Sequence, residues 1–215
     1  MRRISPSRHL MTAALAAAPL LAGAGTAAPP ATAAALPGGT TQVSPLHAVA
    51  ELSARRLATG DLVAAAKWGT GSPVDDPVRE RQVLDSAAAR AGKLGADPRL
   101  TRLVFRDQIE ANKAVQRGLH RLWRDHPSEA PAARPRLDDV RKEVDRLNEA
   151  LVRAVADSAP YRRAAPLCRV ALGISAGHVS RERGLDELHA SALAGSLKSV
   201  CGSTPGNNRL EVHGA

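Results

Sequence analysis

Aromatic side chains are scarce in this chain of 215 residues, which contains one Phe, one Tyr and two Trp. Proteins that bind single-stranded nucleic acid stack bases on such side chains and gather Lys and Arg on one face. Here the charges alternate in sign along the expected helices, so most of the basic excess should lie on a solvated surface. Despite a formal net charge of +9, the composition argues against a nucleic-acid partner.

Long hydrophobic runs are also missing. The most apolar stretch, residues 10–21, is too short and too rich in Ala to anchor the chain in a membrane. Three arginines precede this stretch, and small residues with Ala-x-Ala cleavage options follow it. This order is typical of a secretory signal peptide, which we predict over residues 1–33. We therefore expect a secreted or periplasmic protein with no membrane contact after leader removal, and export by the twin-arginine route stays open.

Cysteine is equally rare, since Cys168 and Cys201 are the only two. In an exported chain an even number of cysteines predicts a disulfide, which contributes roughly 3–4 kcal/mol in the chain-entropy model. A catalytic thiol is the alternative, but no histidine pattern near either residue favours it. The seven His residues are scattered and lack the Cys-x-x-Cys or i, i+4 spacing of metal ligands, so we expect no metal site.

The alternation of polar and apolar residues that marks β-strands is absent, whereas helical periodicity recurs along the chain. We predict an all-α, single-domain bundle of about five to six helices over residues 45–201. A linker at 34–44 precedes it and a disordered tail at 202–215 follows it. Gly60 and Asp61 form a weak point that could break the first helix. The expected helices span residues 45–68, 77–95, 98–126 and 137–158, with one or two shorter ones between 160 and 201.

Polar side chains interrupt the apolar faces of these helices. A helix turns about 100° per residue, which places Asn112 in the centre of the third helix's apolar face and Gln116 at its flank. Lys113 falls on the opposite, solvent-facing side of the same helix. Glu80 lies on the midline of the second helix's inner stripe, with Asp76 nearby.

Cations occupy inner faces as well. Arg56 and Lys67 share the inner face of the first helix because eleven residues make almost three whole turns, and Arg141 lies at the edge of the fourth helix's apolar stripe. A charge taken out of water without a partner costs several kcal/mol. Inward cations, carboxylates and amides on separate helices therefore indicate one shared polar pocket. Its candidate residues are Arg56, Lys67, Asp76, Arg79, Glu80, Asn112, Gln116 and Arg141.

Each of these residues also has an ordinary structural interpretation. A helical Arg or Glu is usually a solvated surface group, an Asn can satisfy a helix backbone, and a Lys can extend along its stem to water. For the whole set, a structural ion-pair network is the main alternative. A site built from these residues would have no nucleophile, no phosphate-binding glycine loop and no metal cage. It suits instead a small dicarboxylate with a hydroxyl, with catalysis by positioning and electrostatics.

The spacing of these residues is specific in combination. The runs are Arg56…Lys67-Trp68…Asp75-Asp76-Pro77-x-Arg79-Glu80, then Val104 to Ile109 with Asn112 and Gln116, then Leu137…Arg141…Asp145…Leu147-Asn148. They closely resemble the all-helical chorismate mutases over about residues 45–201. The leader and the cysteine pair resemble the secreted subclass of that family.

The resemblance implies a cofactor-free rearrangement of chorismate, a dicarboxylate with an ether bridge and a ring hydroxyl, to prephenate. Arg56 and Arg141 would bind the two substrate carboxylates, while Lys67 would contact a carboxylate and the ether oxygen. Gln116 would donate a second hydrogen bond to that oxygen, where negative charge grows as the C–O bond breaks. The enzyme would contribute a compact near-attack conformer of the substrate and stabilisation of this charge.

The other candidates would surround the rest of the substrate. Asp76 and Glu80 would accept a hydrogen bond from the hydroxyl, Asn112 would lie beside a carboxylate, and Arg79 would line the pocket. The resemblance also suggests a homodimer in which each pocket is made within one chain.

Two positions depart from the secreted subclass, whose members often have Glu where this chain has Gln116 and Thr where it has Asn112. An amide donates without a titratable proton, so we predict activity that persists as pH rises through neutrality. Two rival functions stay open on the sequence. One is a non-catalytic secreted binder of small dicarboxylates built on the same bundle, and the other is a structural or host-interaction protein whose inward charges pair with each other.

Overall fold

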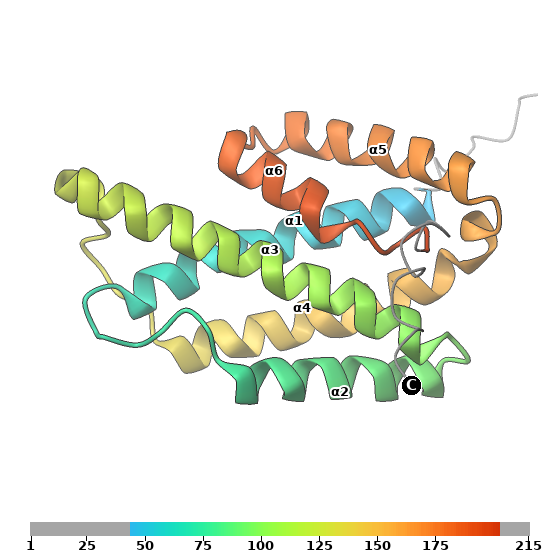
Figure 1. Cartoon of the computed structure of the whole chain (residues 1–215), viewed down its shortest axis with the longest axis horizontal. Helices are drawn as coiled ribbons and strands as arrows, with labels where there is room; N and C mark the ends of the chain where they lie inside the picture. Colours follow the sequence, from blue (N-terminus) through green and yellow to red (C-terminus); the bar gives the residue numbers. More distant parts are fainter. Residues whose placement is uncertain (1–43, 203–215) are drawn as a thin grey trace, which may run out of the picture. The chain divides into compact units, whose positions relative to one another are not determined.

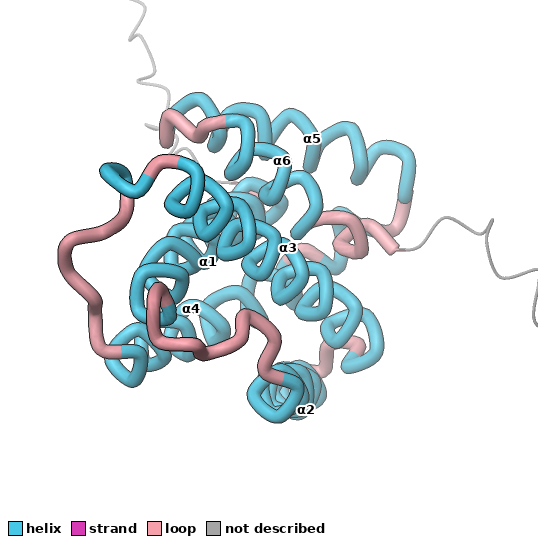
Figure 2. Tube along the Cα trace, turned by 60° about the vertical axis from the view of Figure 1, so that its left-hand side comes forward, coloured by secondary structure: helices cyan, strands magenta, loops and turns pink. Residues whose placement is uncertain are grey.

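The computed structural model describes residues 44–202, and every regular element in this range is helical (Figures 1 and 2). The all-α prediction is confirmed. The expected leader, most of the linker and nearly all of the tail lie outside the described residues. Within residues 44–202, six α-helices and two short 3-10 helices follow one another: α1 (Pro45–Lys67), α2 (Pro77–Lys93), α3 (Pro98–Asp125), η1 (Pro127–Glu129), α4 (Leu137–Asp157), η2 (Ala159–Arg162), α5 (Ala165–Glu182) and α6 (Glu187–Ser196).

Local sequence signals explain where α2 and α3 begin. Each has proline as its first residue and aspartate immediately before it. Asp76 accepts a hydrogen bond from the main-chain N–H of Arg79 at 3.0 Å, and Asp97 accepts one from that of Arg99 at 2.8 Å. These bonds satisfy N–H groups that have no partner within the helix.

Helix α1 lies at the centre of the bundle and packs against α3, α4, α5 and α6 (Figure 1). It is continuous, so Gly60 and Asp61 do not break it. A Cβ atom at Gly60 would lie 3.1 Å from Nδ2 of Asn112 on α3, which shows that glycine permits a close approach of these two helices. Because α1 is unbroken, Arg56 and Lys67 stay on one face.

The core is aliphatic, as expected from the scarcity of aromatic residues. Phe105 is fully buried and belongs to a core cluster of otherwise mostly aliphatic side chains from all six helices. A smaller cluster forms where Trp123 packs with Ala64, Ala65 and Trp68 at the C-terminal end of α1. None of the helices in residues 44–202 is long and apolar enough to cross a membrane.

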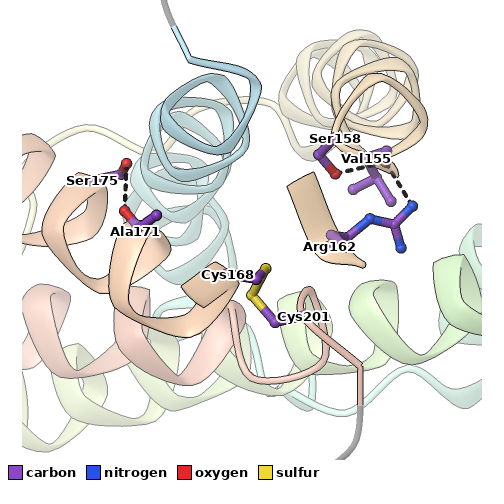
Figure 3. The surroundings of a disulfide bond; sticks show 7 residues. All are labelled: Val155, Ser158, Arg162, Cys168, Ala171, Ser175 and Cys201. Atoms are coloured by element: carbon purple, nitrogen blue, oxygen red, sulfur yellow. Dashed lines mark hydrogen bonds between the residues drawn. A yellow bond between two sulfur atoms is a disulfide. The ribbon is translucent and has the colours of Figure 1, made fainter. Parts of the chain in front are cut away.

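The predicted disulfide is present. Cys168, in the first turn of α5, bonds to Cys201, in the turn after α6, with a Cα–Cα distance of 5.7 Å (Figure 3). Near it, the side chains of Ser158 and Arg162 both donate to the main-chain oxygen of Val155. The bond therefore ties the end of the described chain to the helical bundle.

Candidate active site

A cavity of about 110 Å³ lies between α1, α2, α3 and α4, and all eight residues predicted to share a polar pocket line it. Apolar side chains such as Val63, Val83 and Ile109 complete its wall. Cations outnumber carboxylates in this lining, so the cavity suits an anionic ligand. The cations of the lining are Arg56, Lys67, Arg79, Lys113 and Arg141, and its carboxylates are Asp76 and Glu80.

Arg56 is the most enclosed of these cations, with 4% of its surface exposed. Its Nε donates to Oδ1 of Asn148 at 2.8 Å, and its Nη1 donates to the main-chain oxygen of Gln108 at 2.9 Å. Burial lowers the pKa of Arg56 to about 10, and the positive charge of Arg79 acts in the same direction. The guanidinium is still protonated at neutral pH, and its remaining N–H groups can bind an anion.

Lys67, the last residue of α1, is another buried cation and is 9% exposed. Its Nζ donates to the main-chain oxygens of Pro73 and Val74 at 2.8 and 3.1 Å. Burial lowers the pKa of this ammonium, although the negative charge of Asp76 opposes the shift. An ammonium has three N–H donors, so one is left for a ligand.

Asp76 and Glu80 reach the cavity from the first turn of α2. While Oδ1 of Asp76 caps the helix, its Oδ2 lies 3.5 Å from Nη2 of Arg141. Glu80 accepts from the main-chain N–H of Asp76 at 3.4 Å and from Nζ of Lys113 at 3.2 Å. A carboxylate has about four lone-pair sites, so both residues can still accept a hydrogen bond from a ligand hydroxyl.

Lys113 was misplaced by the periodicity argument, which put it on the solvent side of α3. It is 8% exposed, and its ammonium lies 3.1 Å from Asp75, 3.2 Å from Glu80 and 2.8 Å from Glu110. Burial by itself would lower the pKa of Lys113, but hydrogen bonds to these three carboxylates outweigh it and raise the pKa. The acidic run at Asp75 and Asp76, followed by Glu80, was the sequence signal that a buried cation lies opposite.

Arg79 and Arg141 lie at the rim of the cavity, with 30% and 39% of their side chains exposed. Arg79 pairs with Asp145 of α4 at 2.5 Å. Arg141 lies 3.5 Å from both Asp76 and Asp138. Because exposed ion pairs of this kind contribute no more than about 1 kcal/mol, Arg141 can turn toward a ligand at little cost.

Asn112 and Gln116 lie one turn apart on α3 and are hydrogen-bonded to each other. Nε2 of Gln116 donates to Oδ1 of Asn112 at 2.8 Å, and Nδ2 of Asn112 donates to the main-chain oxygen of Arg56 at 3.3 Å. Gln116 is 4% exposed, and its buried Oε1 has no hydrogen-bond partner among the described residues. The second N–H of its amide is left for a ligand.

The cavity therefore contains two kinds of cation. Arg56 and Lys67 are deeply buried and bonded to uncharged oxygens. Arg79, Lys113 and Arg141 are paired with carboxylates. A ligand anion gains most from the first kind, because no carboxylate of residues 44–202 forms an ion pair with Arg56 or Lys67.

A separate group of side chains, outside this cavity, brings together atoms of the metal-ligand type. Donor atoms of His47 on α1 and of His178 and Glu182 on α5 lie within 4.8 Å of one another. His178 and Glu182 form an exposed pair at 3.0 Å, four residues apart. The metal-ligand spacings considered in the sequence join only His and Cys residues, so a histidine paired with a glutamate four residues later does not match them.

Comparisons with known proteins agree with the geometry. Residues 47–117 match the family model described as chorismate mutase type II. A secreted chorismate mutase of Mycolicibacterium smegmatis is 35% identical over 187 residues, which cover 87% of this chain and 99% of the relative. Another, of Mycobacterium tuberculosis, is 31% identical, with 78% of this chain and 82% of the relative covered.

A solved structure supports the same assignment. The crystal structure of chorismate mutase from Burkholderia thailandensis superposes with a TM-score of 0.69 at 34% identity, covering 74% of this chain and 99% of the other. Sequence and fold thus agree over 82% to 99% of the length of these relatives. We conclude that this chain is a member of the chorismate mutase family.

Proposed function

We propose that the cavity binds chorismate, with Arg56 and Arg141 holding its two carboxylates, and that Lys67 and Gln116 promote its rearrangement to prephenate. The protein is a chorismate mutase, an isomerase. The observation that carries the residue assignment is the placement of Arg56 and Lys67. Both are buried at one cavity, and the protein satisfies them only with uncharged oxygens within residues 44–202. A dianionic substrate would supply the negative charge that these cations lack.

The proposed chemistry needs no group that forms a bond to the substrate. In the rearrangement a C–O bond breaks and a C–C bond forms within one molecule, so atoms and electrons balance without a second reactant. Negative charge grows on the ether oxygen. The free N–H of Lys67 and the second amide N–H of Gln116 are the donors we assign to that oxygen. Donors fixed before the reaction stabilise the transition state more than the ground state.

The remaining lining residues orient the substrate. Asp76 and Glu80 would accept a hydrogen bond from the ring hydroxyl with the lone pairs that their protein donors leave unused. Asn112 would lie beside a carboxylate, and Arg79 would add positive charge at the rim. Together these contacts would hold the substrate in a compact, chair-like conformer that brings the two reacting carbons together.

The enzyme is secreted. Its relatives carry that description, and a disulfide suits an oxidising compartment. We expect chorismate as its small-molecule substrate, no nucleic-acid partner, and no membrane contact after the leader is removed.

We also propose a homodimer with one complete cavity in each chain. Helix α5 carries an outward stripe of Leu167, Val170 and Ile174, which are 72%, 63% and 68% exposed. Apolar side chains at this i, i+3, i+7 spacing favour burial against another surface, here a second copy. Sedimentation should give a dimer for the wild type and a monomer with unchanged kcat for Ile174→Asp. A wild-type monomer would contradict this proposal.

A continuous absorbance assay of chorismate loss tests the activity and the residue roles together. Gln116→Leu should lower kcat about a hundredfold, because it removes one donor to the ether oxygen while preserving the shape of the side chain. Calorimetry with a dicarboxylate transition-state analogue should still detect ligand binding to this variant. Arg56→Ala should instead weaken binding of the same ligand.

Other outcomes would favour the rival functions. A wild-type protein that binds the analogue without consuming chorismate would be a non-catalytic carboxylate binder. If calorimetry detects no heat with the analogue, the inward charges serve only each other, as in a structural protein.

A further inference from the structure

Helix α4 provides partners of different charge to two arginines of the cavity. Asp145 and Asn148 lie one turn apart on this helix, and each bonds to one arginine. Asp145 gives a carboxylate to Arg79, whose side chain is 30% exposed at the rim. Asn148 gives an amide oxygen to Nε of Arg56, which is 4% exposed. The buried arginine thus receives an uncharged partner where its exposed neighbour receives a charged one.

The contacts of Arg56 fix its orientation without neutralising it. Its Nε and Nη1 are bonded to Asn148 Oδ1 and to the main-chain oxygen of Gln108, at 2.8 and 2.9 Å. Two bonds to a planar guanidinium set the direction of the whole group. Arginine has donors only, so the oxygen of the Asn148 amide must face it. Among residues 44–202, no carboxylate forms an ion pair with Arg56, and its free edge keeps its attraction for an anion.

We propose that Asn148 is a positioning residue that aims the Arg56 guanidinium at a substrate carboxylate and, because it is uncharged, sets the affinity for that carboxylate. This inference rests on the proposed function, since it assumes that Arg56 binds the substrate. An aspartate at this position would have the same shape but would form an ion pair with Arg56. The substrate carboxylate would then compete with a protein carboxylate for the same cation.

Three substitutions separate the charge, the acceptor and the shape of Asn148. Asn148→Asp should raise KM about tenfold, because an ionised partner binds a guanidinium more strongly than an amide does, and kcat should change less than KM. Asn148→Leu keeps the shape but removes the acceptor, so it should raise KM as well. Asn148→Gln keeps an uncharged acceptor, has room in the cavity of about 450 Å³ between α2 and α4, and should restore a KM near that of the wild type.

The matched control is Glu149→Gln, the next residue on α4. Glu149 pairs with Arg90 on the surface at 2.6 Å, away from Arg56. This variant should leave KM and kcat unchanged. Thermal unfolding of every variant identifies a loss that comes from instability instead of orientation.

A double-mutant cycle isolates the interaction itself. In an Arg56→Ala background, Asn148→Asp should no longer raise KM or weaken the calorimetric binding of a dicarboxylate analogue, because the guanidinium that it acts on is gone. If Asn148→Asp binds substrate as tightly as the wild type, or if its effect persists without Arg56, the inference is overturned while the activity stands. If the wild type neither consumes chorismate nor binds the analogue, the proposed function fails, and the inference fails with it.

Discussion

The cavity holds its cations in two ways. On its buried wall, formed by Arg56 and Lys67, the cations have uncharged partners, whereas its other cations are paired with carboxylates. On the wall, Arg56 and Lys67 are 4% and 9% exposed and are bonded to amide and main-chain oxygens. Arg79 and Lys113 are bonded to carboxylates instead. The pKa values follow the same division, since burial lowers the pKa of Lys67 whereas three carboxylates raise that of Lys113.

For the two buried lysines of the cavity, this difference separates a proposed ligand-binding group from a structural one. Arg141, whose ion pairs lie at the exposed rim, can still turn toward a ligand. A buried cation beside carboxylates is already compensated, and its removal leaves unpaired negative charge. A buried cation beside neutral oxygens still has most of its electrostatic attraction to give to a ligand. The two lysines are the sharpest case, because they have nearly equal burial but different partners.

The largest effect should therefore separate Lys67 from Lys113. Lys67→Gln should lower kcat about 100- to 1000-fold, because it removes a charged donor from the ether oxygen. Lys113→Gln should lower kcat less than about tenfold but reduce the free energy of unfolding by about 1–3 kcal/mol, because it deprives three carboxylates of their cation. Steady-state kinetics and thermal unfolding of the two variants measure both effects. Equal losses of kcat in both variants would show that the kind of partner does not decide the role.

A second comparison concerns the donors to the ether oxygen and their response to pH. The amide of Gln116 does not titrate. Lys67 donates only as a protonated ammonium, that is, at a pH below its pKa, and burial lowers this pKa. The wild-type kcat/KM should thus stay level through neutral pH and fall only in alkaline solution. The fall should begin at a pH below 10.5, the ordinary pKa of lysine, because burial lowers the pKa of Lys67.

Gln116→Glu should reverse this behaviour. A carboxyl group donates only while protonated, so kcat/KM should fall about tenfold per pH unit above its pKa. At acid pH the variant should approach the wild type. A wild-type profile that declines in the same steep way across neutrality would remove Gln116 from its assigned role.

Helical periodicity accounts for much of this site, and its failures have identifiable causes. It placed Arg56 and Lys67 on one face because both belong to one uninterrupted helix. The close approach of Asn112 to Gly60, where a Cβ atom would lie 3.1 Å from Nδ2 of Asn112, has no local sequence pattern. For Lys113 helical periodicity gave a wrong result, because it describes only the direction in which a side chain points from the axis of its own helix. It cannot say that the acidic start of α2 covers that side of α3.

Asn148 shows a different limit. Its sequence neighbourhood, with Asp145 and Glu149, is typical of a solvated helix face, and both of those neighbours do form exposed ion pairs. Its role becomes visible only after α4 packs against α1 and brings its amide to Arg56. A contact between two residues that lie 92 positions apart in the chain has no periodic signature in either helix.

The smallest effect on catalysis should come from the disulfide, which is connected to the buried wall and not to the rim. Nε2 of Gln108 donates to the main-chain oxygen of Ser196 at 3.1 Å, and the main-chain oxygen of the same Gln108 accepts from Arg56. The main-chain N–H of Ser199 also donates to Asp107 at 2.8 Å. This path joins the segment that ends at Cys201 to the guanidinium of Arg56.

The double variant Cys168→Ser with Cys201→Ser should lose roughly 3–4 kcal/mol of stability in the chain-entropy model, measured by denaturant unfolding. At a temperature where it stays folded, its KM should rise only about two- to threefold, because the hydrogen bonds of Gln108 persist but fluctuate more. Asp145→Asn, which acts on the carboxylate-paired Arg79 at the rim, should show additive effects with this variant, since the two sites share no hydrogen-bond or ion-pair partner among residues 44–202. Strongly non-additive effects of the two variants would mean that the rim and the buried wall respond as one unit. The division between the two kinds of cation would then not extend to the helices that hold them.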